Sequence, residues 1–261
     1  AEGGEPRVVA IQRGDGPQMS LRLRGTVPFG TVGVSYRRRV ENPLYHAGHS
    51  MVTALQRGGI RPRGHVRVAA VSESLPLLAA RRSAPVSELI HALGKNSDNF
   101  TAEMLLKVMG AEQSRPGTSA GGVEVLRETL RAAGVDLGDV TLRNGSGLFE
   151  GNEVSANDFI ALLNHMYTSA GLRPEYLAHL AVGGADGTLR RRLRDLPAPR
   201  IVRAKTGTLN DVIALSGYVV GPTPQRTASF SILLNGVRGR QGAARRLADD
   251  IVRAIARSLY P

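Results

Sequence analysis

Two short groups of polar residues in this sequence have side chains that could do chemistry. The first, Lys205-Thr206-Gly207-Thr208, continues an apolar run from Ile201 and is predicted to lie on a β-strand. Its ammonium group and hydroxyls can bind a carboxylate, and its glycine leaves space for another molecule's backbone. The second, Ser97-Asp98-Asn99, lies far upstream at the start of a helical pattern. Either group alone is weak evidence for a functional site, because the first can arise by chance and the second is also typical of a helix cap.

Hydrophobic periodicity predicts the elements that would position these groups. Strands are expected at 8–11, 21–26, 32–36, 65–71, 77–80, 200–209, 212–220 and 227–235. Helices are expected at 43–57, 83–93, 99–109, 123–133, 155–169 and 243–259, with a loop at 111–122. Chemical markers support several boundaries: helices begin at Asn42-Pro43 and at the capping box Ser155-x-x-Asp158, and they end at Gly58, Gly94 and Gly134.

Two of these helices carry apolar stripes. In the helix at 99–109, one face is predicted to hold Phe100, Met104, Leu105, Val108 and Met109. In the last helix the stripe consists of Leu247, Ile251, Ile255 and Leu259. Because Asp249 and Asp250 interrupt the arginines on its other side, we expect this stripe to pack on the core and not in a membrane.

The order of the elements predicts two domains with a border near residues 80–85. Residues 1–82 are rich in strands, whereas residues 83–261 combine helices with at least three consecutive antiparallel strands. The predicted fold class is therefore α+β, with helices packed on an antiparallel sheet.

Composition and charge narrow the possible functions. The net charge is +12, and all but three of the 34 basic residues are arginine. These arginines are scattered, with short clusters only at 37–39 and 190–192, so no nucleic acid is expected as a partner. The positive charge does not exclude an anionic lipid or an anionic cell-wall polymer as a partner. The absence of cysteine excludes disulfides and thiolate metal sites, and it fits an oxidising compartment.

No cofactor and no metal are predicted. His46 and His49 are spaced to share a helix face, but without a matching carboxylate or cysteine we favour surface or packing roles. No run approaches the roughly 20 apolar residues that cross a bilayer. The chain starts without an initiator methionine or an apolar signal core, from which we expect a processed or excised N-terminus.

Five stretches in a fixed order carry a family resemblance. They are 41–48 (ENPLYHAG), 96–106 (NSDNFTAEMLL), 144–148 (NGSGL), 183–189 (GGADGTL) and 204–209 (AKTGTL). With them the chain from about Asn42 onward resembles serine-type D-alanyl-D-alanine carboxypeptidases. More narrowly, it is similar to low-molecular-mass penicillin-binding proteins with a large insertion between the nucleophile motif and the Ser-x-Asn motif.

The resemblance implies a fold, an activity and roles for individual residues. It implies a β-lactamase/transpeptidase-like domain preceded by the tail of a small β-rich inserted domain. The activity would be hydrolysis of a D-Ala-D-Ala bond or a D-amino-acid cross-link through a serine acyl-enzyme. Ser97 would shuttle a proton, Asn99 would hold the substrate amide and the catalytic lysine, and Lys205 would act electrostatically and as a proton relay. Thr206, Gly207 and Thr208 would bind substrate, the two threonines at its carboxylate, with the Thr208 N–H as one oxyanion donor.

The same resemblance implies the surroundings in which the protein works. Its partners would be peptidoglycan stem peptides and β-lactam antibiotics, and its location periplasmic or otherwise extracytoplasmic. Asp186 and Ser146 lie in glycine-rich turns, and we expect turn roles for both. The family often has aspartate where Asn144 stands, which weakens any assignment at that turn.

One departure from the family pattern is large. No serine in this sequence is followed three residues later by lysine, so the Ser-x-x-Lys nucleophile motif is absent. We expect the nucleophile on a missing N-terminal segment of the same protein, which would also pair with the strand at 227–235. This chain alone is then expected to be inactive. Two alternatives stay open: a non-catalytic binder of cell-wall peptides that has lost its nucleophile, and a basic module that binds an anionic polymer.

Overall fold

The computed structural model describes residues 6–15, 18–31, 33, 40–72, 74–135, 138, 140–148 and 151–261. The chain divides into two compact units, Ala1–Arg81 and Arg82–Pro261. Among the described residues, no helix is both long and apolar enough to cross a membrane.

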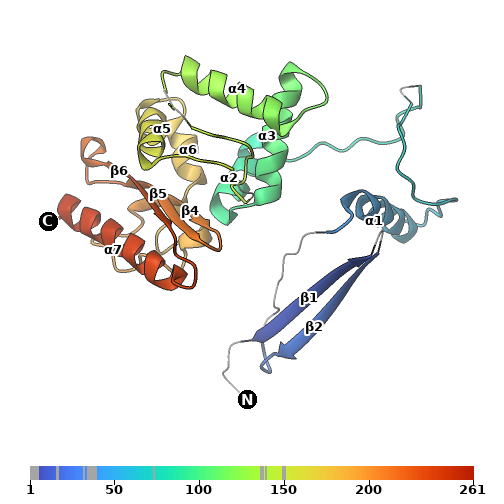
Figure 1. Cartoon of the computed structure of the whole chain (residues 1–261), viewed down its shortest axis with the longest axis horizontal. Coiled ribbons are helices and arrows are strands. Elements are labelled where there is room, and N and C mark those ends of the chain that lie inside the picture. The colour runs from blue at the N-terminus through green and yellow to red at the C-terminus, as the bar shows by residue number, and fades with distance from the viewer. Residues whose placement is uncertain are drawn as a thin grey trace. The chain divides into compact units, whose positions relative to one another are not determined.

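The first unit contains a hairpin and one helix (Figure 1). Strand β1 (Arg7–Asp15) pairs antiparallel with β2 (Gln18–Thr26), in register from Arg7 opposite Thr26 to Asp15 opposite Gln18. Helix α1 (Pro43–Arg57) begins after Asn42, whose side chain accepts a hydrogen bond from the Tyr45 N–H at 3.3 Å. The predicted strands at 8–11 and 21–26 and the predicted helix are therefore confirmed.

Two predicted strands of this unit are wrong. Residues 65–71 and 77–80 have no regular secondary structure, and most of their side chains are exposed. A run of β-forming residues becomes a strand only where a neighbouring strand accepts its hydrogen bonds. No such neighbour lies beside either run among the residues that the structure describes. The predicted strand at 32–36 lies outside the described residues, apart from residue 33.

The second unit is built on a four-stranded antiparallel sheet with the order β3-β4-β5-β6. Its strands are β3 (Ala181–Val182), β4 (Val202–Thr208), β5 (Val212–Val219) and β6 (Ala228–Asn235). The last three form the predicted meander, and the predicted α+β class is confirmed. The two-residue strand β3 and the 3₁₀ turns Gly187–Leu189 and Pro224–Arg226 were not predicted.

Helices cover both faces of this sheet (Figure 1). On one face lies α7 (Gln241–Leu259), whose residues Ala248, Val252 and Ala256 pack on apolar side chains of β4, β5 and β6. On the other face lie α5 (Ala156–Thr168), which begins with the predicted capping box, and α6 (Arg173–His179), which was not predicted. There the Tyr218 hydroxyl donates to the Leu163 carbonyl at 2.6 Å.

The predicted core stripe of the last helix is only half right. Ile255 and Leu259 pack against the core, but Leu247 is 51% exposed and Ile251 38% exposed. The face toward the sheet consists instead of Ala244, Ala248, Val252 and Ala256. Small side chains let the helix axis lie close to the strands, so the buried face is decided by fit and not by hydrophobicity alone.

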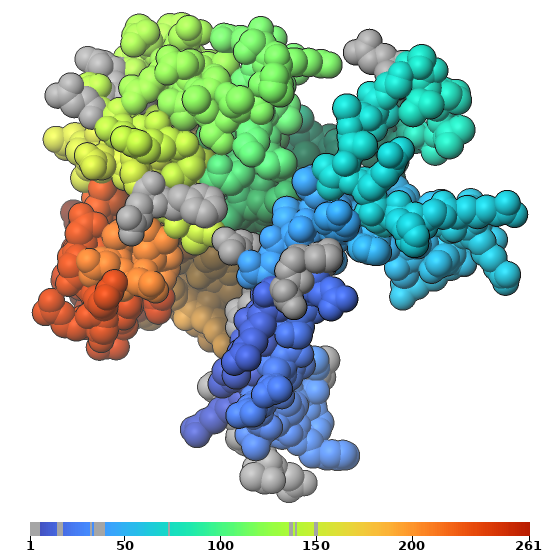
Figure 2. Space-filling model, turned by 45° about the vertical axis from the view of Figure 1, so that its right-hand side comes forward, coloured from blue at the N-terminus to red at the C-terminus, as the bar shows by residue number. Residues whose placement is uncertain are grey.

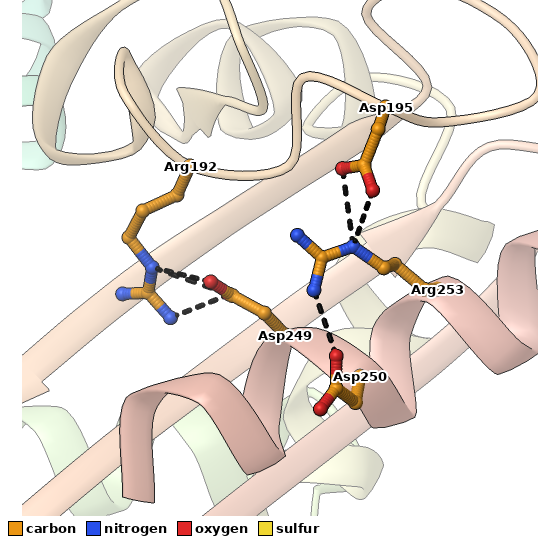
Figure 3. Close-up of polar contacts among 5 residues, drawn as sticks. All are labelled: Arg192, Asp195, Asp249, Asp250 and Arg253. Carbon is orange, nitrogen blue, oxygen red and sulfur yellow. Dashed lines mark hydrogen bonds and ion pairs between the residues drawn. The ribbon is translucent and has the colours of Figure 1, made fainter. Parts of the chain in front are cut away.

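Ion pairs fasten α7 to the segment that precedes β4 (Figure 3). Arg192 contacts both carboxylate oxygens of Asp249, with 2.7 Å between Nη2 and Oδ1. Arg253 binds Asp195 at 3.0 Å and Asp250 at 2.8 Å. Asp249 is buried, whereas Asp195 and Asp250 are exposed, so only the Arg192–Asp249 pair is largely shielded from water.

Three further helices precede the sheet: α2 (Val86–Asn96), α3 (Asn99–Gln113) and α4 (Ser119–Ala132). Gly94 does not end α2 as predicted, and the helix continues to Asn96. The predicted loop at 111–122 is also too long, because α4 begins at Ser119 after the Thr118 cap. A side chain at Gly122 would lie 1.9 Å from the Leu106 carbonyl oxygen, so glycine permits α3 and α4 to touch.

The buried face of α3 is not the predicted one. Leu106 and Gly110 are its buried residues, whereas Phe100 is 73% exposed and Val108 is also exposed. The contact with α4 sets this orientation, and the two helices form one continuous green surface in Figure 2.

Candidate active site

The junction between α2 and α3 holds Ser97 in an unusual backbone conformation. Ser97 has φ 56° and ψ 54°, in the left-handed region that non-glycine residues seldom adopt. The next residue, Asp98, caps α3, because its side chain accepts a hydrogen bond from the Thr101 N–H at 2.9 Å. The helix-cap interpretation is therefore right for Asp98. Ser97 is the C-cap residue of the preceding helix, and its hydroxyl does not cap α3.

That hydroxyl contacts the lysine of the second motif. Lys205 Nζ donates to Ser97 Oγ at 2.6 Å and to the Thr206 carbonyl at 2.8 Å. Lys205 lies on β4 and is partly buried, and burial lowers the pKa of its ammonium group. The tertiary structure thus joins the two groups of polar residues that are far apart in the sequence.

The pKa of Lys205 predicts how stability depends on pH. Because the folded state holds this proton less tightly than the unfolded state, burial of the charge costs free energy at neutral pH. The cost fades as the pH rises from the lowered pKa toward the usual value of 10.5. We therefore expect Lys205→Met to be most stabilising near neutral pH, with a shrinking advantage toward pH 10. Urea titrations of both proteins across this range measure it, and a constant difference would contradict the prediction.

The motif lies on an edge of β4 that is open beyond β3. Strand β3 pairs only with Arg203 and Ala204. The Val220 N–H donates to the Ile201 carbonyl and the Leu209 N–H to the Val212 carbonyl, with continuous register between them. Since hydrogen-bonded pairs alternate along an antiparallel ladder, the odd-numbered residues of β4 face β5. The N–H groups of Thr206 and Thr208 therefore point to the open side, where no strand pairs with 205–208 in the described part of the chain.

A fourth side chain joins this group. Thr206 Oγ1 donates to Thr188 Oγ1 at 2.9 Å, and Thr188 lies in the 3₁₀ turn after β3. Gly207 and Thr208 follow on the same strand, and Thr208 is exposed. Asn99 is exposed in the first turn of α3, outside the hydrogen-bonded group of Ser97, Lys205, Thr206 and Thr188. Sequence reasoning missed Thr188, although its glycine-rich stretch was one of the five family matches.

Lys95 and Asp186 form a second polar contact beside this site. The Lys95 Nζ lies 2.8 Å from Asp186 Oδ2, and the other carboxylate oxygen accepts the Val182 N–H at 2.8 Å. Burial tends to raise the pKa of Asp186, but hydrogen bonds from Lys95 and Val182 outweigh it and hold this pKa below its usual range. Sequence reasoning missed Lys95, and the only available signal was its scarcity as one of three lysines.

Three other residues noted in the sequence have contacts of their own. Ser146 donates both its N–H and its hydroxyl to Glu103 Oε1, at 2.9 and 2.5 Å. Asn144 accepts the Gly147 N–H at 2.8 Å, as a turn residue does. His49 is exposed on α1 and stacks on Tyr45, with 6.4 Å between ring centroids.

Comparison with known proteins places the chain in a family. Residues 3–257 match the model of the D-Ala-D-Ala carboxypeptidase 3 (S13) family, and the chain belongs to this family. It is 36% identical over 244 residues to a D-alanyl-D-alanine carboxypeptidase of Actinomadura sp. (strain R39), covering 90% of this chain and 45% of that protein. The chain thus spans about half the length of the curated relatives that it matches.

Solved structures show the same fold. Penicillin-binding protein 4 of Haemophilus influenzae, complexed with a β-lactam, matches with a TM-score of 0.71 and 23% identity over 90% of this chain and 54% of its own. A penicillin G-acylated predatory endopeptidase of Bdellovibrio bacteriovorus matches with a TM-score of 0.53 and 17% identity over 85% of this chain and 60% of its own. The predicted β-lactamase/transpeptidase-like fold is confirmed.

Proposed function

We propose that the protein to which this chain belongs is a peptidoglycan D,D-carboxypeptidase or endopeptidase that acts through a serine acyl-enzyme. The contact between Lys205 Nζ and Ser97 Oγ, beside an open strand edge, carries this proposal. The family supports it, as does the name of its Actinomadura relative. The protein would work outside the cytoplasm on peptidoglycan stem peptides and would bind β-lactams as analogues of them.

The contacts support a proton relay through Ser97. Because Lys205 donates to Ser97 Oγ, the serine's own hydrogen is left to point away toward a substrate. In acyl transfer the leaving nitrogen needs a proton and the attacking hydroxyl must lose one. Ser97 would give its proton to the leaving nitrogen and receive the one released by the nucleophile. Lys205 would hold the Ser97 oxygen in place and stabilise negative charge on it.

The open edge of β4 would bind the peptide in an extended conformation. Its carboxylate would be held by the Lys205 ammonium group and the hydroxyls of Thr206 and Thr208, with Gly207 giving room for the peptide backbone. The Thr208 N–H, which points to this edge, would donate to the oxyanion. Asn99, at the start of α3, would contact the substrate amide.

A segment upstream of this chain would supply the nucleophile. This sequence has no Ser-x-x-Lys, and the chain spans about half the length of its curated relatives. The same segment would pair with the outer edge of β6, which is the last strand of the sheet. Residues 1–82 would be the remainder of an inserted domain, and residues 83–261 would be most of the transpeptidase-like domain.

A non-catalytic cell-wall peptide binder is the second candidate, because the carboxylate-binding residues are present and the nucleophile motif is not. Incubation of the full-length protein with benzylpenicillin separates the two. A stoichiometric penicilloyl adduct on a serine of the upstream segment supports the enzyme. Saturable binding of stem peptides without any adduct identifies the binder.

We expect the 261-residue chain by itself to form no stable penicilloyl adduct. Ser97 has no lysine three residues later to activate it as a nucleophile. Intact-mass measurement after incubation with excess benzylpenicillin tests this expectation. An adduct of one penicillin per chain, mapped to Ser97, would show that this serine attacks directly and would overturn its role as a relay.

A further inference from the structure

The buried amino group of Lys95 has partners that anchor the end of α2. Its Nζ donates to the Leu180 carbonyl at 2.7 Å and to Asp186 Oδ2 at 2.8 Å, and the residue is only 8% exposed. Lys95 is two residues before Ser97, at the point where α2 ends. A lysine is seldom buried this far unless its charge is paired. Here the paired charge is used to hold the helix end against the 180–186 segment.

Asp186 links Lys95 to β3 and β4, and β4 carries the Lys205 half of the site. Through Val182 its carboxylate fixes the short strand β3, which pairs with β4 immediately before Lys205. Two residues further on, Thr188 contacts Thr206. The Lys95–Asp186 pair therefore lies between the backbone that carries Ser97 and the strand that carries Lys205.

The backbones on the two sides of this pair touch, which leaves little room for adjustment. A side chain at Gly94 would lie 2.3 Å from the His179 carbonyl oxygen, and one at Gly187 would lie 2.5 Å from the Lys95 carbonyl oxygen. Contacts this close exclude any residue larger than glycine without movement of the backbone. The ion pair and these two contacts define one arrangement of α2 against the turn.

We propose that Lys95 and Asp186 are positioning residues that hold Ser97 Oγ against Lys205 Nζ. The left-handed conformation of Ser97 is a strained state, and it persists only where surrounding contacts enforce it. Neither Lys95 nor Asp186 is in the hydrogen-bonded group of Ser97 and Lys205, so they act through the backbone and not on a substrate. The kinetic part of the test rests on the proposed function; the spectroscopic part does not.

The spectroscopic test follows the titration of Lys205 in this chain. With ¹³Cε-labelled lysine the spectrum has three signals, because lysine occurs only at 95, 107 and 205. We compare wild type with Lys95→Met and Asp186→Asn, and we use Lys107→Met, at an exposed position of α3, as the matched control. Arg203 near Asp186, His179 near Lys95, and His91 near His179 stay unchanged throughout.

The direction of the change separates positioning from simple charge removal. If the pair holds Ser97 against Lys205, either variant admits water to Lys205 and raises its pKa toward the usual value. Loss of the negative charge of Asp186 would by itself lower the pKa of Lys205. A rise in Asp186→Asn, which keeps an acceptor for the Val182 N–H, is therefore the expected result. An unchanged or lowered pKa of Lys205 in Asp186→Asn would overturn the proposal, even if Lys95→Met fails to fold.

The kinetic test measures acylation of the full-length protein by benzylpenicillin. We expect the acylation rate constant to fall about 100-fold in both variants, as for misplaced catalytic groups, with the final adduct amount per folded protein unchanged. A merely structural role would lower the fraction of protein that is folded and leave the rate constant of the folded protein unaltered. An unchanged rate constant in the variants of an acylating wild type would overturn the proposal. An unreactive wild type would contradict the proposed function instead, and the titration would still decide the role of the pair.

Discussion

Replacement of Ser97 or Lys205 by alanine should lower the rate of penicillin acylation of the full-length protein by roughly two orders of magnitude or more. The two side chains share one hydrogen bond of 2.6 Å, and either truncation removes the relay that this bond supports. Stopped-flow measurement of acylation at several penicillin concentrations gives the rate constant directly. The effects should not add in the double variant, because both residues act as one unit.

Ser216→Ala is the matched control for this experiment. Ser216 lies opposite Lys205 in the sheet register, and its hydroxyl bonds that of Ser231 at 2.9 Å and not the motif. The Ser216→Ala substitution should leave the acylation rate constant unchanged.

Melting temperatures of the Ser97 and Lys205 variants should stay near or above that of wild type. A Ser97→Ala protein that acylates normally but melts far earlier would show that this serine serves the helix junction alone.

Asp249→Asn should cost about 3 kcal/mol of the free energy of unfolding, because it leaves Arg192 charged without its partner. Asp249 is 8% exposed and contacts Arg192 through both oxygens, so little water reaches the pair. Urea denaturation of the two proteins measures the loss. Since the pair joins α7 to the segment before β4, its rupture should also loosen the sheet that carries the site (Figure 3).

Asp250 offers a control on the same helix. Its side chain is 67% exposed and binds Arg253, so Asp250→Asn should cost no more than about 0.5 kcal/mol. Replacement of both partners, in Arg192→Met with Asp249→Leu, should recover most of the loss, because no charge is then left unpaired. Equal losses at 249 and 250 would mean that burial does not govern the strength of these pairs.

Local chemistry in the sequence determined where several elements begin. Asn42 followed by Pro43, and Ser155 followed by Asp158, satisfy the first N–H groups of a helix with neighbouring atoms, so α1 and α5 start as predicted. The alternation of β4, β5 and β6 is equally local, as is the turn between β4 and β5. The resemblance assigned Ser97 and Lys205 to one site. In the structure Lys205 Nζ lies 2.6 Å from Ser97 Oγ, and the catalytic roles of the two residues stay predictions.

Only the tertiary structure decided which faces are buried and how the site is held. Leu247 is exposed and Ala248 buried because α7 must lie close to the strands, which a hydrophobicity pattern does not express. Gly122 lies within a helix because α3 touches it there, although glycine alone predicts a loop. The sequence assigned no role to Lys95 and only a turn role to Asp186, yet the two side chains meet across 91 positions of the chain. Contacts of this kind depend on the whole fold, and no local pattern in the sequence specifies them.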